Sequence, residues 1–120
     1  MSFRNVIAWQ KAIDLVELVY KETANLPDIE KFGLQSQMRR AVISIPSNIA
    51  EGYGRGGTVE YIRFVDISMG SLRELETQIE IAKRLDYFDS EKLDNSIIEM
   101  GKLLFSLRRG LKSKQQTPLP

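Results

Sequence analysis

One segment, residues 34–52 (LQSQMRRAVISIPSNIAEG), constrains the fold more than any other, because its apolar residues recur at intervals of three and four positions. An α-helix turns by about 100° per residue, so residues at this spacing share one side of a helix. Pro46 lies inside the segment and has no N–H to donate, which predicts a bend there. The side that other helices must cover consists of Leu34, Met38, Ala41, Val42, Ile45, Ile49 and Gly52.

Polar side chains follow one edge of this apolar side at spacings of three and four, namely Gln37, Arg40, Ser44, Asn48 and Glu51. Two interpretations remain open: a solvated face, or a hydrogen-bond network with another helix or another subunit. Asn48 lies closest to the apolar side, and a buried carboxamide needs hydrogen-bond partners. Asn48 and Glu51 are therefore candidate residues of a subunit interface.

Three further segments have the helical period, and each is bounded by residues that break helices. The segment 5–25 ends before Pro27, because the residue before a proline is pushed away from helical angles. The segment 58–86 follows a glycine-rich loop, and Thr58 is expected to cap it. The segment 89–113 has apolar residues at coiled-coil spacing, with Asp89 as its expected cap.

These patterns predict an all-α fold, an up-down-up-down antiparallel four-helix bundle over residues 1–113. Residues 114–120 lack a period and end in Thr-Pro-Leu-Pro, so we expect a flexible tail. The predicted core positions outside 34–52 are Trp9, Ala12, Ile13, Val16, Val19 and Tyr20, then Tyr61, Phe64, Val65, Ser68, Leu72, Leu75, Ile79 and Ala82, and finally Leu93, Ile97, Met100, Leu104, Leu107 and Leu111.

The composition excludes several classes of protein, since the chain has no cysteine and no histidine. Disulfide scaffolds, zinc fingers, cysteine nucleophiles and histidine bases are all excluded. Glu74, Glu76 and Glu80 are close together, but the spacing of Glu76 and Glu80 from nearby arginines favours ordinary pairs within a helix. We expect no enzyme, no metal and no cofactor. Without a signal peptide or a membrane span, a cytoplasmic location is expected.

Several apolar residues lie outside the predicted core positions. Ile62 and Met69 are one heptad apart, as are Ile98 and Phe105, and Leu18 faces away from the core of its helix. Isolated apolar residues on a surface are common, but pairs at heptad spacing on two helices suggest a second interface. A homo-oligomer is favoured over scattered surface residues.

Basic residues give the second functional signal, because the chain carries five of them and no acidic residue after position 99. Clustered cations suit phosphate, although helix C-termini also favour basic residues. In the loop GYGRGG, a plain turn is favoured, and the alternative is that Arg55 and Arg63 hold a phosphate. The candidate nucleic-acid-binding residues are Arg39, Arg40, Arg55, Arg63, Lys102, Arg108, Arg109, Lys112 and Lys114.

Three blocks resemble a known family: AWQKAIDLVELVYKET, QMRRAVISIPSNIAEGYGRG and GSLRELETQIEIAKRLDY. They are similar to the four-helix-bundle proteins encoded by intervening sequences of bacterial 23S rRNA genes, and to accessory variability determinants of diversity-generating retroelements. The similarity extends from about residue 6 to residue 105. It implies a homopentamer without known catalysis. The retroelement relatives are basic and associate with a reverse transcriptase and nucleic acid, whereas this chain is nearly neutral.

Two hypotheses follow. In the first, a non-enzymatic, oligomeric bundle binds RNA or another nucleic acid through clustered arginine and lysine. In the second, the protein is an oligomeric adaptor whose partner is another protein. Retention on RNA that depends on salt distinguishes them, because phosphate contacts weaken as ionic strength rises.

Overall fold

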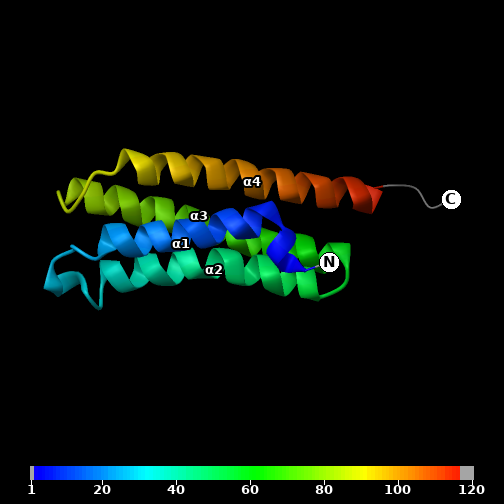
Figure 1. The fold of residues 1–120 in the computed structure, drawn as a ribbon, viewed down its shortest axis with the longest axis horizontal. Helices are drawn as coiled ribbons and strands as arrows, with labels where there is room; N and C mark the ends of the chain where they lie inside the picture. Colours follow the sequence, from blue (N-terminus) through cyan, green and yellow to red (C-terminus); the bar gives the residue numbers. More distant parts are fainter. Residues whose placement is uncertain (1, 117–120) are drawn as a thin grey trace.

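A computed structural model of the protein describes residues 2–116, which form four long helices and two short 3₁₀ helices (Figure 1). No strand occurs among the described residues, so the all-α prediction is confirmed. In chain order the elements are η1 (Phe3–Asn5), α1 (Ile7–Thr23), η2 (Asp28–Glu30), α2 (Leu34–Gly54), α3 (Thr58–Arg84) and α4 (Glu91–Gln116).

Each long helix runs antiparallel to the next one along the chain, and the first helix also contacts the last (Figure 1). The turns are short; α2 and α3, for example, are separated by residues 55–57. Short connections place consecutive helices side by side. The four helices therefore close a ring around one core, and the predicted up-down-up-down bundle is confirmed.

The core of α2 matches the sequence pattern. All seven residues of the predicted apolar side are buried, and α2 continues without interruption through Pro46.

Two features bring α3 close to α2. Ser68 donates a hydrogen bond of 2.9 Å from its hydroxyl to the Ile45 carbonyl, and a Cβ at Gly52 would lie 2.7 Å from the Cβ of Phe64. Small side chains therefore set the distance between the two helices.

The prediction for α1 was partly wrong. Only Ala12 and Val19 of the predicted set are buried, while Tyr20 is exposed. Leu18, which was expected to face away from the core, packs against it. The buried residues of α1 are Ala8, Ala12, Leu15, Val19 and Thr23.

The reason is that α1 lies between two helices. Trp9, Ile13 and Val16 line a groove shared with α2, whereas Leu15 and Leu18 line a groove shared with α4. A helix with two neighbours spreads its apolar residues over a wide arc. The prediction of one narrow apolar stripe on α1 therefore misplaced the centre of the buried side of this helix.

The predicted helix ends need three corrections. Thr58 is the first residue of α3 and provides no side-chain cap, and Gly57 is the N-cap residue. Ser90 caps α4 in place of Asp89, because its hydroxyl accepts a 3.1 Å hydrogen bond from the Leu93 N–H. The helix α4 continues to Gln116, so Lys114 is helical and not part of a tail. The rest of the predicted tail, residues 117–120, lies outside the described residues.

Polar contacts join the two halves of the chain at the end of the bundle where α2 begins. Tyr87 donates from its hydroxyl to Glu30 over 2.8 Å, and Ser90 donates to Glu22 over 3.1 Å. Glu30 also accepts from the Leu34 N–H. This backbone hydrogen bond, followed by the one from Tyr87, lowers the pKa of Glu30 below its ordinary value.

The apolar residues predicted to lie outside the core fall into two groups. Ile62 is only 6% exposed and belongs to the core, and Met69 is partly buried against it. Ile62 was therefore wrongly placed outside the core. It lies one helical turn before Asp66, which bonds to Arg108 of α4, so this side of α3 faces α4. Ile98 and Phe105 are 57% and 59% exposed, as predicted.

Candidate nucleic-acid interface

The nine basic candidates divide into two groups. Four of them bind groups of their own chain, namely Arg39, Arg55, Arg63 and Arg108. The other five make no side-chain hydrogen bond or ion pair with the part of the chain that the structure describes: Arg40, Lys102, Arg109, Lys112 and Lys114. Only this second group is available for phosphate without loss of an existing contact.

Arg39 joins α2 to the end of α1. Its guanidinium donates to the Thr23 hydroxyl over 3.1 Å and to the Tyr20 carbonyl over 3.3 Å. It also lies 4.4 Å from the centre of the Tyr20 ring. A cation at a helix C-terminus satisfies unpaired carbonyls and interacts favourably with the helix dipole. Arg39 therefore has a structural role within the bundle.

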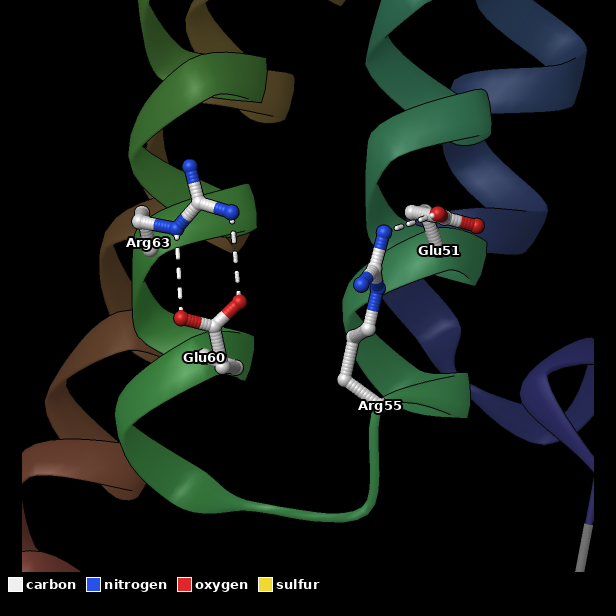
Figure 2. A network of polar contacts seen from close by, with 4 residues as sticks. All are labelled: Glu51, Arg55, Glu60 and Arg63. Atoms are coloured by element: carbon white, nitrogen blue, oxygen red, sulfur yellow. Dashed lines mark hydrogen bonds and ion pairs between the residues drawn. The ribbon is translucent and has the colours of Figure 1, made fainter.

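Arg55 and Arg63 lie on opposite sides of the α2–α3 turn (Figure 2). Arg55 pairs with Glu51 at 2.7 Å, and Arg63 pairs with Glu60 through two hydrogen bonds of 3.3 and 3.2 Å. Each pair connects residues one helical turn apart, and all four side chains are about half exposed. Exposed pairs of this kind contribute about 0–1 kcal/mol each.

Both guanidiniums also approach one aromatic ring. The central carbons of Arg55 and Arg63 lie 5.1 and 4.7 Å from the centre of the Phe64 ring. The structure thus brings together the two arginines that the sequence pointed to. Glu51 and Glu60 offset their charge, so a phosphate at this turn would have to displace two carboxylates.

A buried hydroxyl lies in the same end of the bundle. Tyr61 packs edge-on against Tyr53, with ring centres 6.0 Å apart. Its hydroxyl is buried and has no hydrogen-bond partner among the described residues. Burial raises the pKa of Tyr61, with a smaller contribution from Tyr53. The phenol therefore stays protonated at neutral pH.

Arg108 holds α4 against α3 through Asp66, with contacts of 2.6 and 3.5 Å. The hydrogen bond and charge of Asp66 raise the pKa of the Arg108 guanidinium above its ordinary value. This contact lies in the second half of α4, toward its C-terminal end. Arg108 therefore positions the end of α4.

Ile98, Lys102, Phe105, Arg109 and Lys112 follow one another along α4 at spacings of four, three, four and three. Residues at this spacing share one side of a helix. This side, which we call the α4 outer face, is separate from the buried seam formed by Leu93, Ile97, Met100, Leu104 and Leu111, and one edge of it borders α3. It carries three unpaired cations and an exposed aromatic ring, while Lys114 lies on another side of the helix.

A second polar region runs between α2 and α3. Asn48 donates to the carbonyl and the hydroxyl of Ser44 over 2.8 and 2.9 Å. Ser71 of α3 donates to the same Ser44 hydroxyl over 2.8 Å. The polar edge of α2 is thus part of a network between helices.

Gln78 lies at this boundary between α2 and α3 and was not among the residues predicted from the sequence. Its side chain is 9% exposed, and its amide oxygen has no hydrogen-bond partner within residues 2–116. A signal was present, because Gln78 falls three residues after Leu75 and four before Ala82, which is the spacing of a buried seam. A carboxamide at such a position predicts a buried polar group.

Two other kinds of site find no support in the described residues. No group of three or more histidine, cysteine, aspartate or glutamate side chains in residues 2–116 has an arrangement suited to a metal ion. Within the same range, every helix is too short or too polar to traverse a bilayer.

Comparisons with known proteins give two matches. A family model described as 23S rRNA-intervening sequence protein matches residues 4–106. Among solved structures, the chain is similar to the crystal structure of a protein with unknown function from the S23 ribosomal protein family of Bacteroides thetaiotaomicron VPI-5482. The identity is 24%, the similarity covers 86% of this chain and 99% of that chain, and the TM-score is 0.75. This likeness supports the fold alone. No curated protein matches the chain.

Proposed function

The chain belongs to the family of 23S rRNA-intervening sequence proteins, and from this premise we propose that it is a non-enzymatic bundle that binds RNA or another nucleic acid through the α4 outer face. The observation that carries the proposal is the set of three unpaired cations on one side of α4: Lys102, Arg109 and Lys112. No acidic residue follows Glu99 on this helix.

The chemistry of the α4 outer face suits single-stranded RNA. Lys102 and Arg109 flank Phe105, which is 59% exposed. Positive side chains follow the phosphate backbone, and an exposed ring offers a surface on which a base can stack. Such an interface would bind with little sequence preference and would weaken as salt is added.

The test removes the three cations together. We expect Lys102→Ala, Arg109→Ala and Lys112→Ala in one chain to weaken binding of a labelled single-stranded RNA of about 20 nucleotides by at least about tenfold at about 50 mM salt. The slope of log affinity against log salt should fall by about 2, because each phosphate contact in single strands contributes about 0.7. Fluorescence anisotropy measures both quantities.

The matched control removes three exposed cations elsewhere on the bundle, with Lys21→Ala, Arg84→Ala and Lys92→Ala in one chain. This variant has the same net charge as the test variant, so general attraction is equal in the two. Equal weakening in both variants, or an unmodified protein that ignores RNA at low salt, would contradict the proposal.

A second candidate function is self-association or protein binding through the same face. Ile98 and Phe105 line a groove of about 540 Å³ between α3 and α4, with Gly101 and Lys102. A second subunit seated on Ile98 and Phe105 would cover Lys102 between them. Assembly through this face and RNA binding through it would therefore compete. Both candidates include an oligomer, so the homopentamer implied by the family resemblance is compatible with RNA binding through the α4 outer face only if its subunits join through other surfaces.

A further inference from the structure

An apolar groove of about 320 Å³ lies between α1 and α2, and we call it the α1–α2 groove. None of its lining residues is charged. The lining residues that carry the argument are Trp9, Ile13, Val16, Ile43, Ser47 and Ala50. Both helices contribute a wall, so one partner surface placed in the groove would cover residues of both.

The wall formed by α2 lacks the charges of an ordinary exposed helix. Ile43, Ser47, Ala50 and Gly54 follow one another at spacings of four, three and four, so they share one side of α2. Ile43 on this side is 41% exposed. A helix side that faces water normally carries charged and polar residues. This side instead has the small and apolar residues of a helix contact.

The wall formed by α1 is apolar as well. Trp9, Ile13, Val16 and Tyr20 share one side of this helix, and the bundle leaves all four partly or largely exposed. The Trp9 ring is held in place by Phe3, which packs edge-on against it with ring centres 5.2 Å apart. The apolar residues of α1 therefore exceed what a single chain buries, and a second surface is needed to cover them.

The α4 outer face has the shape of a partner for this groove. Ile98 and Phe105 are 57% and 59% exposed and lie seven residues apart, which is about 10 Å along a helix. Trp9 and Val16, both on the α1 wall of the groove, are also seven residues apart. Two side chains that project at this spacing can enter a groove between two helices as knobs enter holes.

The charges beside the two surfaces are complementary. Asp14 and Glu17 lie on the outward side of α1 next to the groove and make no ion pair within residues 2–116. Lys21 follows one turn later, toward the end that holds the α1–α2 connection. On α4 the order is reversed, because Glu91 lies at that end and the cations of the α4 outer face follow it. Two bundles side by side in the same orientation therefore oppose acids with cations.

From this arrangement we propose that the α4 outer face of one copy of the chain docks in the α1–α2 groove of a second copy. The inference rests on the second candidate function and adds the surface that receives the α4 outer face. Among the described residues, α1 contacts α2 and α4 but not α3, so the groove and the α3–α4 side lie on diagonally opposite sides of the ring. Each copy thus uses two different faces, and such contacts continue until they close a ring or form a filament.

Two variants block one face each. Ile43→Asp with Ala50→Asp, the groove variant, places two charges in the α1–α2 groove, and Ile98→Asp with Phe105→Asp, the face variant, places two on the α4 outer face. None of the four positions is buried, so circular dichroism should show retained helicity. Light scattering should give the mass of one chain for each variant alone. The unmodified protein should exceed the mass of two chains, because faces on opposite sides do not close with two copies.

Mixing the two variants tests the pairing directly. The groove variant keeps its α4 outer face and the face variant keeps its groove, so one intact contact can form between them. We expect a complex with the mass of two chains that does not grow, because both remaining faces are blocked. Three outcomes would overturn the proposal: an unmodified protein with the mass of one chain, a groove variant that keeps the unmodified mass, or mixed variants that remain single chains.

The matched control is Ile67→Asp with Ile81→Asp on α3. These residues are 40% and 44% exposed, close to the 41% of Ile43, and lie outside both faces. The control should keep the mass of the unmodified protein. A loss equal to that of the groove variant would show that added charge causes the dissociation, which would contradict a contact at the groove.

Charge reversal keeps the proposal testable if the groove variant does not fold, since Asp14 and Glu17 are exposed. Asp14→Lys with Glu17→Lys should weaken assembly by at least about tenfold, because like charges then face each other. Mixing this variant with Lys102→Glu and Arg109→Glu in a second chain should restore assembly. Failure of the mixture to assemble would contradict the pairing of these two surfaces.

RNA binding is measured on the groove variant, whose α4 outer face is intact and uncovered. If both proposals hold, this variant binds RNA at least as tightly as the unmodified protein, and RNA lowers the mass of the unmodified protein because the two ligands compete. A groove variant that ignores RNA would contradict RNA binding and leave the mass measurements unaffected. Failure of one proposal is therefore distinguishable from failure of the other.

Discussion

At the scale of single residues, Gly52 shows how little space separates α2 from α3. A Cβ placed there would meet the Phe64 Cβ at 2.7 Å, the Tyr61 ring at 3.1 Å and the Tyr61 Cα at 3.3 Å. Two of these neighbours are a backbone atom and the first atom of a side chain, neither of which can rotate away. Gly52 is therefore required by close approach of the helices.

We expect Gly52→Ala to destabilise the protein by about 1–3 kcal/mol, the usual cost of overpacking a well-filled core. The measurement is urea unfolding followed by far-UV circular dichroism. Gly54→Ala is the matched control, because no atom lies within 4 Å of a Cβ at Gly54. That variant should leave the free energy of unfolding unchanged or raise it by up to about 1 kcal/mol. Similar losses in both variants would show that the close contact is not the cause.

The residues that were predicted best from the sequence are those of α2, where the apolar residues recur at regular intervals of three and four. The buried position of Gln78 was not predicted, because the core was predicted mainly from the spacing of apolar residues and Gln78 is polar. Asp89 and Ser90 are both good N-cap residues, and sequence cannot choose between them. Which of the two becomes the N-cap depends on the conformation of the turn before α4. In this turn Asp86 has a left-handed φ of 59°.

At the scale of helices, α1 is held by α2 at its C-terminal end. Thr23 donates to the Val19 carbonyl over 2.7 Å and accepts from Arg39. Gln35 of α2 donates to the Thr23 carbonyl over 2.8 Å. The last carbonyls of α1 thus bond to side chains of the next helix, which a helix end needs when it is buried.

Neighbouring arginines allow a direct test of this contact. Arg39→Ala should destabilise the protein by about 1–2 kcal/mol, because it leaves the Tyr20 carbonyl and the buried Thr23 hydroxyl without a charged donor. Arg40→Ala removes the same side chain from the next position, where it has no partner in the described chain, and should change stability by less than about 0.5 kcal/mol. Urea midpoints compare the two. Equal midpoints would mean that Arg39 does not secure α1.

The sequence could not place α1 correctly because its position between α2 and α4 depends on all four helices together. Leu15 and Leu18 face α4, whereas Trp9 and Val16 face α2. Ile62 was misplaced because the side of α3 that carries it and Asp66 faces α4, which the sequence of α3 alone does not show. For the candidate interface, the sequence identified the basic residues but could not show that Arg39, Arg55 and Arg63 are already engaged.

At the scale of the whole molecule, the outward side of α4 is where RNA binding and assembly would compete. Ile98→Asp with Phe105→Asp should lower the mass per particle if this side joins subunits, while circular dichroism should show retained helicity because neither side chain is in the core. Light scattering measures the mass. Ile7→Asp with Val59→Asp, at two other exposed apolar residues, is the control. An unchanged mass in the test variant would place any subunit contact elsewhere.

The closed ring of four antiparallel helices has a practical consequence. An even number of passes returns the chain to its starting side, so residues 2 and 116 both lie at the end that holds the α2–α3 turn (Figure 1). A protein immobilised by a tag at either position would point the opposite tip, which holds the α1–α2 and α3–α4 connections, toward the solution (Figure 1). Surface-based assays can therefore leave the α1–α2 and α3–α4 connections accessible to a partner whichever terminus is tethered.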